Sequence, residues 1–180
     1  MKFPFSRTIS NWYKYHTYKT DDWKFSDERR MFYIREYDEW LQFYLPIPLK
    51  GLTVLDEGAG EGESARFFLE HGARKVICVE PDAVAFKNLL INSKERPMVC
   101  MNRRFDLSDL KFDFDFMKMD IEGFEEAMLS VSDFDKPCVI EYHGLQLREA
   151  FERSGYIIRN KATPPYTIGY AYKNLGDVKP

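Results

Sequence analysis

The stretch VLDEGAGEGES, residues 54–64, passes from an apolar run into a glycine at every second position, with acidic residues among the glycines. A glycine-rich turn directly after an apolar strand is typical of a ligand-binding loop, because bare backbone allows close approach. The chain around it has 180 residues and a formal net charge of −3. This length predicts one domain with a sizeable core, and the charge gives no general attraction to nucleic acid.

Outward from this stretch, apolar runs alternate with helical patterns. Runs rich in Val and Ile predict seven strands, at 53–59, 75–81, 97–101, 115–120, 136–143, 156–160 and 168–174. Apolar residues at helical spacing predict helices between them, at Ser64–His71, Asp82–Lys94, Phe124–Val131 and Leu145–Ser154. The alternation predicts an α/β fold, with a doubly wound, mostly parallel seven-stranded sheet and helices on both faces.

The N-terminal part differs in composition. Residues 1–45 carry 14 of the 29 aromatic residues. Ser26 precedes two acids and predicts a helix start, and Pro46 marks its end. Within this helix the aromatic residues at helical spacing are Tyr33, Tyr37, Trp40 and Tyr44. We therefore divide the chain into an aromatic-rich helical segment, 1–48, and a ligand-binding domain, 49–180; the first is either a lid over the site or a packing element.

Several classes of protein are disfavoured by what the sequence lacks. It has no apolar stretch of membrane-spanning length and no signal-peptide pattern at its N-terminus. The cysteines are odd in number, lie in predicted strands and have no zinc-site spacing, so we expect reduced core residues: Cys78, Cys100 and Cys138. These features predict a cytoplasmic protein without a membrane partner.

The loop itself separates three classes of ligand. A triphosphate loop ends in Gly-Lys-Ser/Thr, but this loop has no lysine; a dinucleotide loop needs a third glycine where Glu63 stands. The acids around the turn are Asp56, Glu57, Glu61 and Glu63. Two unit charges at about 4 Å interact by about 4 kcal/mol at an effective dielectric of about 20, so these acids disfavour a pyrophosphate. A cationic or zwitterionic ligand without phosphate, such as S-adenosylmethionine, fits better.

Two motifs carry a family resemblance. DEGAGEG (56–62) matches the acidic-x-Gly-x-Gly-x-Gly motif of class I S-adenosylmethionine-dependent methyltransferases. MKMDIEGFE (117–125) resembles the KxDxEGxE segment of the FkbM-like methyltransferases, with VIEYH (139–143) on the next strand. The resemblance covers about residues 50–175 and implies a Rossmann-like fold with S-adenosyl-L-methionine as cofactor. The chain departs from the family in the short connection between the third and fourth strands, where we expect at most one helical turn.

The resemblance also implies which residues bind the cofactor. Glu80, at the end of the second strand, is expected to accept the ribose hydroxyls, and Asp106 to bind the adenine amino group unless it is only a turn acid or helix cap. The other cofactor-binding residues that it implies are Asp56, Gly58, Ala59, Gly60 and Asp120.

The catalytic residues follow from the reaction. Methyl transfer is an in-line displacement, so the enzyme chiefly aligns the nucleophile, and a hydroxyl must also lose a proton. Asp120 and Glu122, at the mouth of the fourth strand, are the candidates for orienting or deprotonating the acceptor, and His143 is the next. The paired acids could also hold a divalent metal, but the sequence identifies too few ligands for us to predict one. Glu125 is expected to begin a helix.

We interpret the chain as an FkbM-like O-methyltransferase for a small or sugar-like acceptor. Two alternatives stay open: an RNA methyltransferase, whose basic aromatic N-terminus around Lys14 and Lys19 would stack bases, and a non-catalytic cofactor-binding subunit. TPPY (163–166) is similar to a motif of amino methyltransferases, but it lies between the last two strands rather than after the fourth, so we expect a rigid turn. The acceptor, the methylated atom and the oligomeric state are not predicted.

Overall fold

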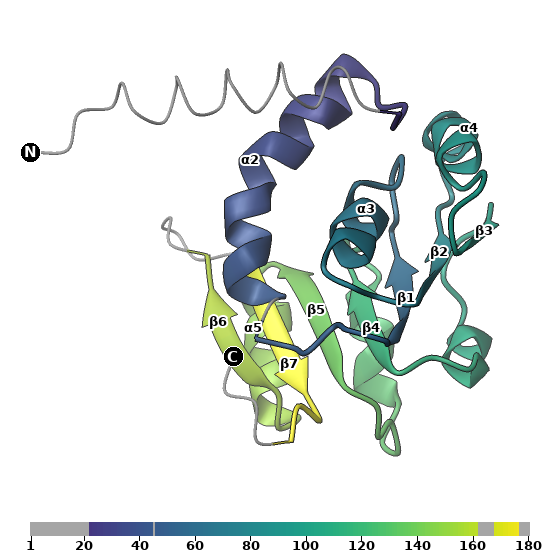
Figure 1. Cartoon of the computed structure of the whole chain (residues 1–180). Coiled ribbons are helices and arrows are strands. Elements are labelled where there is room, and N and C mark those ends of the chain that lie inside the picture. Colours follow the sequence, from purple (N-terminus) through teal and green to yellow (C-terminus); the bar gives the residue numbers. More distant parts are fainter. Residues whose placement is uncertain (1–21, 45, 162–167, 177–180) are drawn as a thin grey trace, which may run out of the picture.

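A computed structural model describes residues 22–44, 46–161 and 168–176. They form three layers, with one sheet between two layers of helices (Figure 1). The strands are β1 (Thr53–Glu57), β2 (Lys75–Val79), β3 (Met98–Met101), β4 (Phe116–Met119), β5 (Cys138–His143), β6 (Ile157–Asn160) and β7 (Ile168–Lys173). Their order is β3-β2-β1-β4-β5-β7-β6. The first five strands are parallel, and β7 runs antiparallel to both of its neighbours. The predicted mostly parallel, doubly wound sheet is therefore confirmed.

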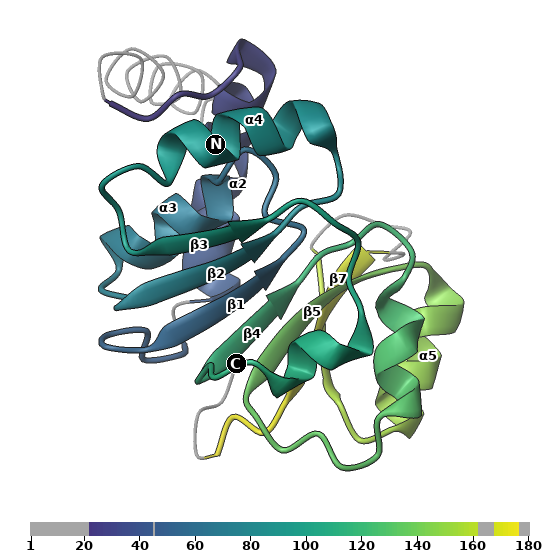
Figure 2. The same cartoon turned by 90° about the vertical axis from the view of Figure 1, so that its right-hand side faces the viewer.

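The two faces of the sheet are covered by different sets of helices (Figure 2). One face carries three α-helices: α2 (Asp27–Phe43), α3 (Glu63–Glu70) and α4 (Ala83–Asn92). The other carries α5 (Leu145–Arg153) and two short 3-10 helices, η1 (Leu107–Lys111) and η2 (Glu125–Ser130). Each face has its own apolar core, and because side chains alternate along a strand, neighbouring residues of β1 belong to different cores.

Helix α2 begins and packs as its sequence indicates. The Ser26 side chain accepts a hydrogen bond from the Arg29 amide at 3.3 Å, which caps the helix. Tyr33 and Trp40 are buried, and the Trp40 ring meets Phe67 of α3 edge-on, with centroids 5.7 Å apart. The aromatic stripe thus joins the core between α2, α3 and the sheet.

Two connections between strands contain short 3-10 helices instead of α-helices. The link from β3 to β4 contains only the single 3-10 helix η1, as its length indicated. The segment after β4 was predicted as a helix over Phe124–Val131, but it forms the 3-10 helix η2 instead. Its start is constrained because the Glu125 side chain folds back to accept from the Gly123 amide at 2.9 Å.

Some sequence predictions fall outside the described residues. These are the basic aromatic segment with Lys14 and Lys19, and the TPPY turn. Residues 22–26 are described and lie against α4, where the Lys24 amide donates to Asn92 at 2.6 Å. No helix among the described residues has the length and apolar character needed to cross a membrane. All three cysteines are free thiols, with Cys100 half-buried and the other two buried.

Candidate active site at the carboxyl edge of the sheet

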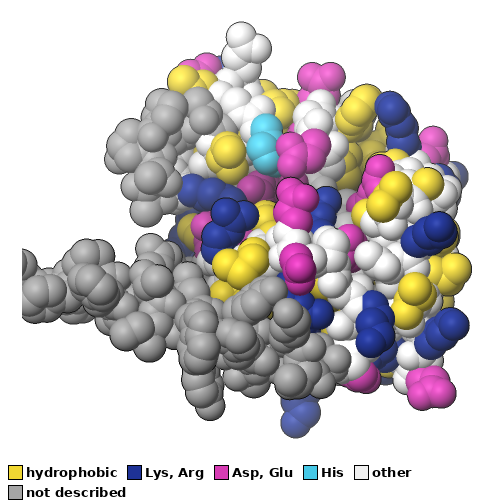
Figure 3. Space-filling model, turned by 90° about the horizontal axis from the view of Figure 1, so that it is seen from above, with side chains coloured by type: hydrophobic (Ala, Val, Ile, Leu, Met, Phe, Trp, Pro, Cys, Tyr) yellow, Lys and Arg dark blue, Asp and Glu magenta, His cyan; other side chains and the backbone are white. Residues whose placement is uncertain are grey.

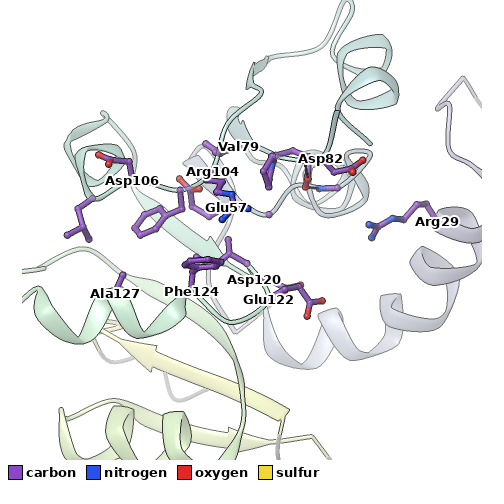
Figure 4. A pocket seen from close by; sticks show the side chains of 17 residues that line it. Arg29, Glu57, Val79, Asp82, Arg104, Asp106, Asp120, Glu122, Phe124 and Ala127 are labelled. Atoms are coloured by element: carbon purple, nitrogen blue, oxygen red, sulfur yellow. Dashed lines mark hydrogen bonds between the residues drawn. The ribbon is translucent and has the colours of Figure 1, made fainter. Parts of the chain in front are cut away.

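A cavity of about 740 Å³ opens where the parallel strands end (Figure 4). Its walls come from the loops that follow β1, β2, β3 and β4, and Arg29 of α2 reaches toward it. This volume lies in the range of roughly 300–1,000 Å³ typical of small-molecule sites, and the carboxyl edge beside β1 is where open α/β sheets bind ligands. The position therefore agrees with the one that the glycine-rich stretch predicted.

The glycine loop is tightly fitted and internally bonded. Gly58 has φ +77°, and a Cβ there would lie 1.8 Å from the Asp120 carbonyl oxygen, so no other residue fits. The amides of residues 58–62 all have acceptors within the loop or on β2 and its end: the Val79 carbonyl for two, Glu80 for Gly60, and Glu63 and the Ala59 carbonyl for the others. The loop therefore offers no unpaired amide to a phosphate group.

Asp56, the acid of the glycine motif, lies beneath this loop rather than in the cavity. It is fully buried, accepts from the Ser64 hydroxyl at 2.6 Å and lies 3.1 Å from the Lys118 ammonium. Lys118 also donates to the Gly58 carbonyl at 2.8 Å. Burial disfavours the ammonium, but the Asp56 and Asp120 carboxylates outweigh it and raise the pKa of Lys118. Ala59 is buried as well. Neither of these two predicted cofactor residues lines the cavity.

Glu80 and Asp106 do line the cavity. The two oxygens of Glu80 accept from the Gly60 amide at 2.8 Å and the Asp82 amide at 2.7 Å, which fixes this carboxylate at the end of β2. Asp106 caps η1, accepting from the Ser108 amide at 2.8 Å while Asp109 bonds back to the Asp106 amide. Asp106 is thus both a helix cap and a cavity residue.

The predicted catalytic residues come together at the ends of β4 and β5. Asp120 and Glu122 line the cavity, and these two side chains and His143 have ligand atoms within 4.8 Å of one another. These three groups could hold a metal ion. On the face of the molecule seen in Figure 3, a histidine side chain lies among Asp and Glu side chains.

Glu125 is the hydrogen-bond partner of His143. This carboxylate is fully buried and lies 3.1 Å from Nδ1 of the imidazole. The hydrogen bond with Glu125 raises the pKa of His143 to about 9, against the effect of burial, and Asp120 and Glu141 add to the rise. His143 therefore carries a proton at neutral pH, which the sequence did not reveal.

One cavity residue and the protonation of two loop acids were not identified from the sequence. Glu57 was counted only as one of the loop acids, yet it is buried and lines the cavity. Burial, with the nearby Asp109 charge, raises the pKa of Glu57 to about 8. Burial also raises the pKa of Glu63 to about 7, against the opposing charge of Arg29. The loop is therefore less negative than its count of acids indicated. For Glu57, the only sequence signal of this role was that an acid stands at a strand position that faces an apolar core.

The comparisons with known proteins agree with the architecture. No family model matches the chain, and no curated protein matches it. Among solved structures, fibrillarin from Aeropyrum pernix with bound S-adenosyl-L-methionine is similar over 74% of this chain and 73% of its own, at 15% identity and a TM-score of 0.57. Magnesium protoporphyrin IX methyltransferase from Synechocystis, also with this cofactor bound, is similar over 92% of this chain and 89% of its own, at 16% identity and a TM-score of 0.57.

A third similar structure is the ribosomal protein L11 methylase from Lactobacillus delbrueckii, over 82% of this chain and 79% of its own, at 20% identity and a TM-score of 0.52. Two of these structures are named as methylating enzymes, one for magnesium protoporphyrin IX and one for a ribosomal protein, and all three sequences are distant from this one. The comparisons therefore show that the chain has the Rossmann-like fold of class I methyltransferases.

Proposed function

We propose that this chain is an S-adenosylmethionine-dependent methyltransferase that methylates an oxygen of a small or sugar-like acceptor. The observation that carries the proposal is the cavity beside β1, where the glycine loop and Glu80 from the end of β2 face Asp120 from the end of β4. The DEGAGEG and DIEGFE motifs and the shared fold of cofactor-bound methyltransferase structures support the same conclusion.

The cavity fits this cofactor better than it fits a dinucleotide. The loop amides are already paired, so they give no anion site, while Glu80 supplies carboxylate oxygens of the kind that accept from ribose hydroxyls. Bound there, the cofactor would supply a methyl group activated by its sulfonium. The protein's own contribution is to hold the acceptor in line and to exclude water.

The protonation states suggest separate roles for the three catalytic candidates. Because His143 is protonated at neutral pH, it would donate a hydrogen bond to the acceptor oxygen rather than remove its proton. Asp120 lines the cavity, and its Oδ1 atom is buried without a hydrogen-bond partner among the described residues. We therefore assign the proton-accepting role to Asp120 and an orienting role to His143, with Glu125 positioning the imidazole.

The first test is binding. S-adenosylhomocysteine, the demethylated product, should bind in calorimetry and raise the melting temperature, whereas NAD should do neither. Tighter binding of NAD would contradict the assignment of the cofactor.

The second test is transfer. Labelled methyl transfer from the cofactor is measured in parallel to fractionated small metabolites and to RNA, with purified protein alone. We expect label in a small metabolite. Label in RNA would support the RNA alternative, and binding without any transfer would support the non-catalytic one. The matched variant is Asp120→Asn, which keeps the volume of the side chain: it should lose transfer by roughly 10²-fold or more, and calorimetry with S-adenosylhomocysteine measures whether Asp120 also contacts the cofactor.

A further inference from the structure

Glu57 is an acid in a place that the fold would fill with an apolar residue. It is the last residue of β1, and its side chain points to the face that carries Leu55, Val79 and Met119 in the apolar core. Its exposed fraction is 0%. Burying a carboxyl group among apolar side chains destabilises the folded state unless a partner satisfies it.

This carboxyl group has no hydrogen-bond partner among the described residues. Among the residues that the structure describes, Glu57 alone has two buried side-chain oxygens that both lack a hydrogen-bond partner. The charged groups that act on it electrostatically are Asp109 and Arg103 from the β3–β4 connection, and Asp56 and Lys118 from the opposite face. None of them is hydrogen-bonded to it. Asp109 is already paired with Arg103, and Lys118 with Asp56.

Glu57 lines the cavity, so a ligand can supply the hydrogen bonds that the described part of the chain does not. Figure 4 shows Glu57 at the centre of the cavity, among side chains from the loops after β2, β3 and β4. With its pKa raised to about 8, the group is largely a neutral carboxylic acid at pH 7. A neutral carboxylic acid presents one donor and one acceptor side by side.

The register of the sheet places this pair next to the proposed ribose site. Glu57 is aligned with Val79, the residue directly before Glu80. If Glu80 holds the ribose, the base attached to that ribose lies beside the end of β2, toward the loop that carries Phe105 and Asp106. Adenine presents an amino donor next to a ring-nitrogen acceptor on the same edge, which is the complement of a carboxylic acid.

We propose that Glu57 is a specificity-determining residue that recognises the adenine of the cofactor through paired hydrogen bonds to its 6-amino edge. The carbonyl oxygen accepts from the 6-amino group, and the hydroxyl donates to the adjacent ring nitrogen. The inference rests on the proposed function and deepens it, because it assigns the base to a residue that the glycine motif does not specify.

The test is a cycle of two ligands and three proteins. The ligands are S-adenosylhomocysteine and its analogue with hydrogen in place of the 6-amino group; the proteins are the wild type, Glu57→Gln and Glu57→Leu. Calorimetry at pH 7 should show that the wild type prefers S-adenosylhomocysteine by roughly 10-fold, because the analogue loses one hydrogen bond and leaves the buried carbonyl oxygen of Glu57 unpaired. Glu57→Gln offers the same donor and acceptor and should keep the preference. Glu57→Leu should reduce it to within about 2-fold.

Two controls make the result unambiguous. Glu57→Leu should be at least as resistant to urea as the wild type, since leucine suits the apolar surroundings. If it does not fold, the pH dependence of Glu57→Gln carries the test: above pH 8, ionisation removes the donor, so binding of S-adenosylhomocysteine should weaken in the wild type relative to Glu57→Gln. Equal pH profiles for the two proteins would overturn the proposal.

The outcomes also separate this inference from the proposed function. If S-adenosylhomocysteine binds and Glu57→Leu retains the full preference for the amino group, the inference fails and the proposed function stands. If S-adenosylhomocysteine does not bind the wild type at all, both fail.

Discussion

Asp56 and Glu57 are adjacent residues at the end of β1, and the two faces of the sheet accommodate them in opposite ways. Both are fully buried acids. On the face covered by α3, Asp56 has the Ser64 hydroxyl and the Lys118 ammonium as partners. On the other face, Glu57 has no hydrogen-bond partner among the described residues. One acid is bonded into the structure around the loop, and the other is a buried residue of the cavity wall whose oxygens are unpaired.

Asp56 and Glu57 differ in their partners because the helices that cover the two faces of the sheet near them differ in length. Helix α3 has eight residues, starts directly after the glycine loop and brings Ser64 onto Asp56. The opposite face has only the 3-10 helices η1 and η2 near this edge, and the cavity lies between the segments that lead into them. The glycine motif thus lies beside the cavity, but the packing on each face decides which of its residues line that cavity.

The largest effect that tests this comparison is expected from Lys118→Met. The change leaves Asp56 buried without its counter-charge, and breaking a buried ion pair from one side costs about 3–5 kcal/mol of folding free energy. Urea unfolding measures the loss. Lys111→Met, at an exposed position, should stay within about 0.5 kcal/mol of the wild type. The double variant Asp56→Asn/Lys118→Met should recover part of the loss, and full stability of Lys118→Met alone would contradict a structural role for the pair.

The fold was predictable because its signals are local and repeated. Apolar strand runs, the cap at Ser26 and the glycine loop each specify their own segment. The type of η2 was not predictable, because a six-residue segment carries no clear helical period. The roles of the loop acids were not predictable either, since whether Glu63 or Glu57 is charged depends on burial and on partners distant in sequence. Pyrophosphate was disfavoured from the sequence by charge, whereas the structure disfavours it chiefly through the paired amides of the loop.

The second prediction concerns Glu80, the cavity acid whose oxygens are held by the Gly60 and Asp82 amides. Glu80→Ala should weaken binding of S-adenosylhomocysteine by about 1.5–3 kcal/mol, the value expected for losing charge-assisted hydrogen bonds to the ribose. Calorimetry measures the affinity, and urea unfolding of the free protein checks that the loop still folds. Asp113→Ala removes an exposed acid that does not line the cavity and should leave the affinity unchanged. An unaltered affinity in Glu80→Ala would remove Glu80 from the site.

The third prediction uses the pH dependence of stability through His143. Its pKa is raised from 6.5 to about 9 in the folded protein, so protonation favours folding. This contribution is fully present below pH 6.5 and is lost as the pH rises through about 9. With allowance for partial exposure we expect about 1–2 kcal/mol.

His143→Gln is the control for this pH dependence, because Glu57, Glu63 and Glu141 also have raised pKa values and lower the stability over part of the same range. The difference in unfolding free energy between wild type and His143→Gln should shrink from pH 6.5 to 9.5. A constant difference would mean that the bond between His143 and Glu125 does not depend on the imidazole proton.

The smallest effect on ligand binding is expected from a change at Asp106. This test decides whether Asp106 has only a structural role, as Asp56 has, or contacts the ligand, as we propose for Glu57. Its side chain already caps η1 through the Ser108 amide. Serine caps a helix about as well as aspartate, so Asp106→Ser should keep the melting temperature, while Asp106→Ala should lower it by at most about 4 °C. If Asp106 is only a cap and Glu57 reads the base, Asp106→Ser should bind S-adenosylhomocysteine within about 2-fold of the wild type. Weaker binding by Asp106→Ser, at an unchanged melting temperature, would instead make Asp106 a ligand contact, and Glu57 would then share the adenine edge with it.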